Sequence, residues 1–465
     1  MLSTRDWALE EFGHVDLGDR RREDRCVRMA AALAAAPAGR VSEVFARDAE
    51  RQGAYDFLEN TKIGASKIGV AVSQACVERC RSHQHCLVLI DGTSLKIADW
   101  GRKKDFGVVG SYRNNARGLK VISAMATSLD GEPLGLLHQH YWTRPTTRPP
   151  RVRTMYRRHE EKETRYWSEV IHEAAARLEG TGCRPWFVID REGDCADTLL
   201  ELARVDGDFT VRSRHDRRLA GPGKRYLVST LRRHELLTEY SLEVAEAHGR
   251  RARTAVMHVR SAQVELDFLD HQTKKHRFLT VWAVLAEEKQ TTPRGEKPIQ
   301  WLLLSNQPAE TADQARRFLG IYTQRWKIEE FHKTWKSGQC CVETTQLHTT
   351  EAVRKWATLH AAVAARTERL KNLARTTPTE PASLELNQDE IRVLVALKRR
   401  IKNSVESVPD DPNISQAVTW IAQLGGYTGK SSGGPPGSIT IARGFEKLLA
   451  SVEAVLAVEN ASRMR

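Results

Sequence analysis

The chain has 465 residues, and its 72 Lys and Arg residues outnumber its 59 Asp and Glu residues, which gives a formal net charge of +13. A cation surplus of this size favours a polyanionic partner, with nucleic acid as the first expectation, although charge alone would also fit RNA or a membrane surface. No apolar run reaches the ~18–20 residues that cross a bilayer, and the first residues show no signal-peptide pattern, so we expect a cytoplasmic protein without a membrane partner.

The first 70 residues are predicted to be helical and basic. Arg22, Arg25 and Arg28 fall on one side of a helix that ends at Pro37. A small module of this kind either reads DNA or is an ordinary basic helical bundle, and the residues alone leave both interpretations open.

The chain contains eight cysteines, which we expect to be free thiols because no export signal is visible. Cys76, Cys80, His83, His85 and Cys86 lie close together in the sequence, which suggests a zinc site. Their spacing matches no standard zinc pattern, however, and cysteine is often simply buried. Burial is therefore the favoured interpretation.

Two short apolar runs end in aspartate, at Leu87–Asp91 and at Trp186–Asp190. Each is predicted to be a buried strand that delivers a carboxylate at its end. A single aspartate at the end of a strand carries little information, because Asp is a common turn residue. Two such aspartates are more informative.

The elements between these two strands predict the fold class. Strands are expected at 117–128 and 133–142, joined by the hairpin signal Asp130-Gly131, and a helix follows at about 159–178. Three antiparallel strands, a helix and a further strand are the order of a ribonuclease-H-like α/β core, a mixed sheet with flanking helices.

The long stretch between Asp190 and the next candidate carboxylate is rich in predicted strands. It predicts a β-rich insertion within the α/β core. The strands are expected at Tyr240–Val244, Ala255–Val259, Val264–Leu269, Phe278–Ala286 and Trp301–Leu304.

The segment Tyr322–Lys336 is predicted to be one helix with an apolar stripe beside an unusual polar one. At about 100° per residue, the polar stripe holds a phenol, the carboxylate of Glu329 and three cations. It is either a solvated face with i,i+4 pairs or a metal-binding glutamate surrounded by phosphate-binding side chains. The two strand-end aspartates favour the second interpretation, because three carboxylates can hold a pair of Mg²⁺ ions.

The spacing of Tyr322, Arg325, Glu329 and Lys336 matches the Tyr-(2)-Arg-(3)-Glu-(6)-Lys signature of bacterial Asp-Asp-Glu transposases. The chain most resembles the Tn-five-like transposases of the insertion-sequence-four family. The resemblance runs nearly end to end. The stretches that carry it include AspArgGluGlyAsp at 190–194, ValArgSerArgHis at 211–215, TrpLeuLeuLeu at 301–304 and ArgTrpLysIleGluGluPheHisLys at 325–333.

This resemblance implies a cut-and-paste DNA transposase that cleaves transposon-end inverted repeats by hydrolysis and transesterification, with a hairpin intermediate, and joins the 3′-OH ends to target DNA. It implies that Asp91, Asp190 and Glu329 are catalytic and bind two Mg²⁺ ions, for which Mn²⁺ substitutes, without an organic cofactor. Further side chains are implied to contact DNA, and Trp301 among them to stack on a flipped base. The DNA-binding residues are Tyr322, Arg325, Lys333, Lys336, Trp301, Arg212 and Arg214.

The resemblance also predicts three domains and a homodimer bound to double-stranded DNA in the bacterial nucleoid. These are a DNA-recognition domain at 1–70, a catalytic domain at 71–372 with its insertion at about 209–306, and a helical dimerisation domain at 373–465. The apolar face of the last helix is either bundle core or a partner surface. Two other functions stay open: a non-catalytic DNA-binding regulator derived from a transposase, and a ribonuclease-H-fold nuclease or resolvase.

Overall fold

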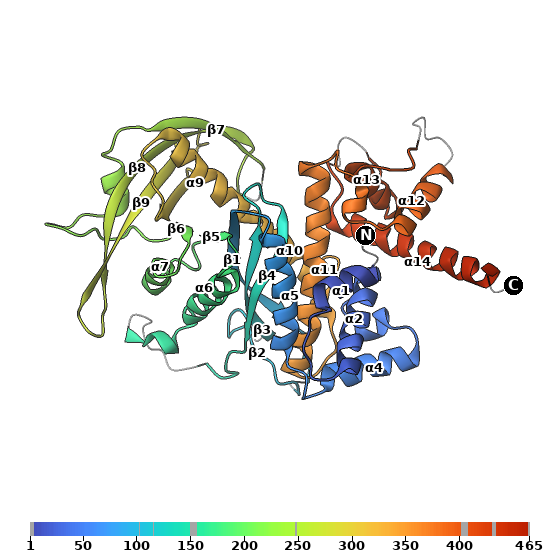
Figure 1. The fold of residues 1–465 in the computed structure, drawn as a ribbon. Helices are drawn as coiled ribbons and strands as arrows, with labels where there is room; N and C mark the ends of the chain where they lie inside the picture. The colour runs from blue at the N-terminus through green and yellow to red at the C-terminus, as the bar shows by residue number, and fades with distance from the viewer. Residues whose placement is uncertain are drawn as a thin grey trace.

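The computed structural model describes residues 4–101, 103–114, 116–148, 156–246, 249–400, 408–429 and 434–463. A single twisted sheet lies at one side of the molecule, and a group of helices lies at the other (Figure 1). The long helix α11 (Thr350–Thr376) runs between them.

The described sheet has ten strands in the order β2-β3-β1-β5-β6-β10-β9-β8-β7, with β4 paired to β3. The strands are β1 (His85–Lys96), β2 (Gly107–Val108), β3 (Arg117–Thr127), β4 (Pro133–Trp142), β5 (Arg184–Ile189), β6 (Asp208–Arg212), β7 (Thr238–Val244), β8 (Arg253–Leu269), β9 (His276–Glu288) and β10 (Gln300–Ser305).

The predicted ribonuclease-H-like order is confirmed. Strands β1, β3 and β4 are antiparallel, and β5 returns parallel to β1 after helix α6 (Arg165–Leu178). The helix predicted at about 159–178 begins later than expected, because a separate 3₁₀ turn, η2 (His159–Glu161), precedes α6.

Both faces of the central strands are buried, which explains why their sequences are continuously apolar. In β1, Leu87 and Leu89 belong to the core that α10 and α11 share, whereas Val88 and Ile90 belong to the core on the opposite face, under α6. This alternation decides which side chains of β1 can reach which helix.

The strands of the predicted insertion extend the same sheet rather than forming a separate one. The prediction of two strands at Ala255–Val259 and Val264–Leu269 was wrong, since β8 is continuous and pairs with β9 without a break from Met257 to Leu269. The polar residues between the two predicted strands belong to β8, where buried and less buried residues alternate. They interrupt the apolar pattern without ending the strand, so the sequence predicted two short strands instead of one. The short helix α8 (Leu227–Leu231) packs against β8 and β9, whereas α7 (Ala196–Leu202), between β5 and β6, packs against α6.

The prediction of one helix over Tyr322–Lys336 was also wrong. The segment contains the end of α9 (Ala312–Gln324) and all of α10 (Trp326–Lys336), separated by a turn at Arg325. The Arg325 amide donates to the Tyr322 carbonyl, and the Ile328 amide donates to the Arg325 carbonyl, both at 3.1 Å. These three-residue bonds tighten the backbone where no Gly or Pro marks a break.

The N-terminal helices pack onto α11 through buried polar contacts. Lys355 Nζ donates to the carbonyls of Leu58 and Asn60, each at 2.8 Å, and Trp356 Nε1 donates to the Gly39 carbonyl at 2.8 Å. The helices of this segment are α1 (Thr4–Phe12), α2 (Arg20–Ala35), α3 (Val41–Val44), α4 (Asp48–Glu59) and α5 (Ala65–Cys80).

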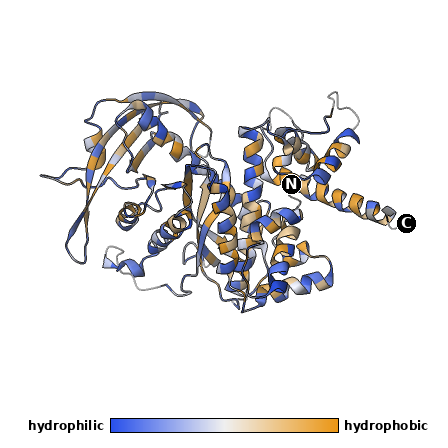
Figure 2. Cartoon of the chain, viewed as in Figure 1, coloured by the Kyte–Doolittle hydropathy of each residue, from blue (hydrophilic) through white to orange (hydrophobic). Residues whose placement is uncertain are grey.

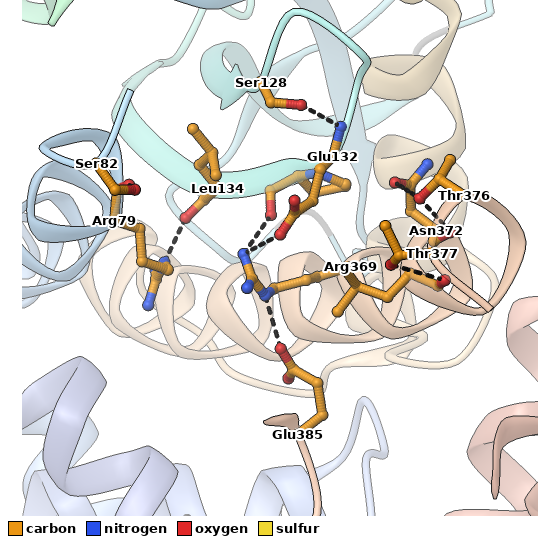
Figure 3. A network of polar contacts seen from close by, with 12 residues as sticks. Arg79, Ser82, Ser128, Glu132, Leu134, Arg369, Asn372, Thr376, Thr377 and Glu385 are labelled. Atoms are coloured by element: carbon orange, nitrogen blue, oxygen red, sulfur yellow. Dashed lines mark hydrogen bonds and ion pairs between the residues drawn. The ribbon is translucent and has the colours of Figure 1, made fainter. Parts of the chain in front are cut away.

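Arg369 of α11 connects the sheet with the C-terminal helices (Figure 3). Its guanidinium pairs with Glu132 at 2.8 Å in the turn before β4 and donates to Glu385 at 2.7 Å. The predicted domain boundary after residue 372 falls within α11, and the division into three domains stays a prediction. The remaining helical elements are η3 (Val342–Thr344), η4 (Ala382–Leu384), α12 (Gln388–Arg400), α13 (Ile414–Leu424) and α14 (Ser438–Arg463).

Helix α14 begins in the C-terminal core and extends beyond it (Figure 1). Leu448 and Val452 are buried against the neighbouring helices, whereas Val458 is 66% exposed. Hydrophobic residues continue along the extending part of the helix (Figure 2). The apolar face of the last helix is therefore core over its first half and uncovered towards its end.

Candidate active site

The parallel pairing of β1 and β5 brings the two predicted aspartates together. Their register runs from His85 opposite Arg184 to Ile90 opposite Ile189, and Asp91 and Asp190 are the next residues on the two strands. Both follow the alternation of Leu89 and Val188, which belong to the core under α10 and α11. Asp91 and Asp190 therefore lie at one level of the sheet, on one face.

The electrostatics agree with this proximity. Burial raises the pKa of Asp190, and the negative charge of Asp91 raises it further, against the lowering effects of Arg325 and of the Glu192 amide, which donates to Asp190 Oδ1 at 2.6 Å. Partial burial raises the pKa of Glu192, and the charges of Asp190 and Asp91 add to this effect. Three carboxylates thus concentrate negative charge at this end of the sheet.

Helix α10 lies along β1 and presents a polar face to it. His332 Nδ1 is 3.5 Å from Asp91 Oδ2, and one turn later Lys336 Nζ donates to Thr93 Oγ1 at 3.1 Å. Glu329 precedes His332 by three residues, so it lies on the same side of α10, one turn closer to the helix N-terminus. The apolar residues Ile328, Phe331 and Trp335 are fully buried and hold the helix against the core.

Arg325 lies where α9 turns into α10 and pairs with the carboxylate of Glu329. Its side chain is buried, and it also interacts electrostatically with Asp91. The Nε and Nη1 atoms of Arg325 find no hydrogen-bond partner among the residues that the structure describes. Buried guanidinium donors are costly when unsatisfied, and phosphate oxygens are suitable acceptors for them.

Two family profiles match this chain. The profile described as transposase DNA-binding matches residues 4–63, and the profile described as transposase DDE domain matches residues 69–365, which is more than half of the chain. The chain belongs to the DDE transposase family. The transposase therefore joins a DNA-binding segment, α1 to α4, to a catalytic fold of the ribonuclease-H-like class.

The aspartates of the transposase fit a divalent cation. Carboxylate oxygens are the ligands that Mg²⁺ prefers, and a bound cation would offset both the burial and the nearby Asp91 charge that raise the pKa of Asp190. Glu329 does not complete the set as it stands, because its carboxylate is paired with Arg325. In the described part of the transposase, no three Asp, Glu, His or Cys side chains are placed to hold a metal ion.

A cluster of rings and guanidinium groups connects Trp301 with the polar face of α10. The half-buried Trp301 on β10 packs edge to face against Tyr322, with ring centroids 5.7 Å apart. Arg212 lies 6.0 Å from the Trp301 ring and 5.8 Å from the Tyr322 ring, and Arg325 lies 5.8 Å from the Tyr322 ring on its own segment. Four of the predicted DNA-binding residues thus form one cluster.

Among the described residues, the other three predicted DNA-binding residues make no side-chain hydrogen bond or ion pair with this cluster. Lys333 is exposed on α10, and Lys336 is half-buried beside Thr93. Arg214 is exposed, and its backbone amide donates to Asp194 Oδ2 at 2.7 Å. Asp194 therefore ties the segment after β6 to the loop that carries Asp190.

The cysteine-rich segment is part of the core. Cys76, Cys80 and Cys86 are buried and pack with Cys183, which comes from the start of β5. All eight cysteines are free thiols in this structure. The buried cluster therefore contains Cys183, whereas the cluster suggested by the sequence contained His83 and His85.

Sequence reasoning assigned no role to Glu192 or His332, although both lie beside the aspartates. Glu192 could have been found from its place two residues after Asp190, and His332 from its helical spacing of three residues from Glu329. Among the described residues, no helix combines the length and the apolar content needed to cross a membrane.

Proposed function

We propose that this transposase is a Tn-five-like enzyme of the insertion-sequence-four family, which excises its element by a cut-and-paste mechanism and inserts it into target DNA. The observation that carries the proposal is the arrangement of Asp91 on β1 and Asp190 directly after the paired strand β5. Arg325 precedes α10, and Glu329 and Lys336 lie on α10, which covers the same face. The signature residues match the family at the same spacing.

Asp91, Asp190 and Glu329 are the proposed catalytic ligands of two Mg²⁺ ions, with Mn²⁺ as a substitute. When bound, the ions activate an attacking oxygen and stabilise the leaving one. Glu329 joins the aspartates by releasing Arg325, and Arg325 then directs its donors to a phosphate of the DNA. This exchange couples the arrival of DNA to the assembly of the carboxylate set.

The remaining polar residues of the site hold the DNA strand. Tyr322, Lys333 and Lys336 bind phosphates near the cleaved bond, and Arg212 and Arg214 bind phosphates on the side of β10. Trp301 stacks on a base displaced from the duplex when the cut end closes into a hairpin. The transposase acts as a homodimer that holds two transposon ends, with residues 1–70 recognising the inverted repeats and 373–465 forming the dimer contact, and it associates with the nucleoid through DNA.

The base-stacking role of Trp301 predicts different effects for two substitutions. Trp301→Ala removes the stacking surface and is expected to slow hairpin formation about 5- to 150-fold, since stacking contributes ~1–3 kcal/mol per base. Trp301→Phe keeps a ring against Tyr322 and is expected to stay within about 3-fold of wild type, because Phe retains a stacking face. Single-turnover cleavage of a pre-bound end measures both, and equal rates for the two variants would exclude stacking as the role of Trp301.

The function itself is tested with purified protein and linear DNA that carries the gene and its native flanks. Discrete cuts at inverted repeats, present with Mg²⁺ and absent with EDTA, are the expected result. Strand-transfer products distinguish the transposase from a nuclease or resolvase, which would give cuts alone. Specific binding without cutting would instead identify a DNA-binding regulator.

A further inference from the structure

Three side chains on neighbouring strands form a row that ends at the candidate active site. Asp91 on β1 stands opposite Ser123 on β3, and Ser123 stands opposite Gln139 on β4. Directly opposed residues point to the same face of a sheet, which here is the face that α10 covers. His332 of α10 therefore lies over this row.

Hydrogen bonds connect His332, Ser123, Gln139 and Tyr141 into a chain, and His332 lies within ion-pair distance of Asp91. His332 Nδ1 is 3.5 Å from Asp91 Oδ2, and His332 Nε2 is 3.2 Å from Ser123 Oγ. Gln139 Nε2 donates to Ser123 Oγ at 3.0 Å, and the Tyr141 hydroxyl donates to Gln139 Oε1 at 2.9 Å. Ser123 is completely buried and His332 is 6% exposed, so water does not compete for these contacts.

The donor and acceptor groups along this chain of hydrogen bonds are compatible with one another. A carboxylate oxygen accepts, so the tautomer of His332 that can donate to Asp91 carries its proton on Nδ1. In that tautomer, Nε2 accepts the hydroxyl hydrogen of Ser123. The Ser123 oxygen accepts from the side-chain amide of Gln139. The side-chain oxygen of Gln139 accepts in turn from the Tyr141 hydroxyl.

We propose that His332 is a positioning residue that orients the Asp91 carboxylate for metal binding, and that Ser123 and Gln139 hold the imidazole in the required tautomer. The inference rests on the proposed function, in which Asp91 is a metal ligand. Donation from Nδ1 to Oδ2 would leave the second carboxylate oxygen of Asp91, Oδ1, available to a cation. The 3.5 Å separation is long, as contacts in active sites often are before substrate is bound.

Substituting His332 with Asn or with Gln distinguishes the roles of its two ring nitrogens. The side-chain nitrogen of His332→Asn takes the place of Nδ1 and keeps the donation to Asp91. That of His332→Gln reaches the place of Nε2, which keeps the contact with Ser123 and loses the contact with Asp91. Mn²⁺ binding to the complex with a pre-cleaved transposon end, corrected for binding to the DNA alone and followed by electron paramagnetic resonance of free Mn²⁺, measures the difference without relying on activity.

We expect His332→Gln to weaken Mn²⁺ binding about 10- to 100-fold and to raise the Mg²⁺ concentration for half-maximal cleavage by the same factor, because partners of metal ligands have effects of this size. His332→Asn is expected to stay within about 3-fold of wild type, because it preserves the donated hydrogen bond. Equal weakening by both variants, or none by either, would overturn the proposal.

Asp91→Asn separates failure of this inference from failure of the proposed function. If Asp91→Asn leaves Mn²⁺ binding unchanged, Asp91 is not a ligand and the proposed function fails. If Asp91→Asn abolishes binding while His332→Gln does not weaken it, only the positioning role fails. Should His332→Gln lower the melting temperature, Ser123→Ala decides by the same titration: weaker Mn²⁺ binding supports the chain, and wild-type binding overturns it.

Discussion

Glu329→Ala is expected to abolish cleavage of the transposon end while leaving end binding intact. Removing one carboxylate of the proposed metal set costs several kcal/mol of transition-state stabilisation, which corresponds to a loss of at least about 10³-fold in rate. Binding is expected to persist, because the substitution also frees the Arg325 guanidinium that Glu329 occupies in the DNA-free protein. Gel-shift titration and single-turnover cleavage, each with Mg²⁺, measure the two properties separately.

Glu330→Ala is the matched control for this experiment. It removes the same charge from the next position of α10, where Glu330 lies 3.4 Å from Lys371. We expect the control to cleave at nearly the wild-type rate. Metal-dependent cleavage that survives in Glu329→Ala would remove Glu329 from the catalytic set, and loss of binding in that variant would show a structural role instead.

Trp356→Ala is expected to have the largest effect on stability, through the packing of the N-terminal segment onto α11. Trp356 is fully buried, donates to the Gly39 carbonyl at 2.8 Å and packs edge to face against His360 at 4.5 Å. Loss of a buried tryptophan side chain costs about 3–5 kcal/mol, and the Gly39 carbonyl loses its donor as well. Trp356→Phe is expected to lose less, because it keeps most of the ring volume.

Thermal unfolding and limited proteolysis of residues 1–63 measure this loss. Trp326→Ala serves as the control, because the Trp326 side chain is 60% exposed and surface substitutions usually change stability by no more than about 0.5 kcal/mol. The opposite result is that Trp356→Ala has the same melting temperature and the same protease resistance as Trp326→Ala. That result would show that α11 does not hold the N-terminal segment in place.

The candidate site could be predicted where the chemistry is local. An apolar run that ends in aspartate marks Asp91 and Asp190, and helical spacing marks Glu329, because strand and helix periods are visible in a single stretch of sequence. The ribonuclease-H-like order followed from the same periods and is confirmed. The roles of the three carboxylates stay a prediction, since geometry alone does not assign chemistry.

The features that sequence reasoning missed depend on contacts between distant segments. The turn at Arg325 interrupts a continuous helical pattern with neither Gly nor Pro, so periodicity could not locate it. The place of His332 depends on Ser123, which lies 209 residues away in the chain. Cys183 joins Cys76 and Cys80 only because β5 pairs with β1, a register that no local pattern encodes.

The attachment of two segments to α11 has a consequence for how DNA is cut. Lys355 and Trp356 hold the N-terminal segment, and Trp335 of α10 donates to the Ala357 carbonyl at 2.9 Å on the same helix. The segment that matches transposase DNA-binding domains and the helix that carries Glu329 thus contact the same helix, α11. An extra base pair between a recognised sequence and a cleaved bond would displace that bond by about 3.4 Å and rotate it by about 35°. Under the proposed function, we therefore expect the number of base pairs between the recognised sequence and the cut to be fixed.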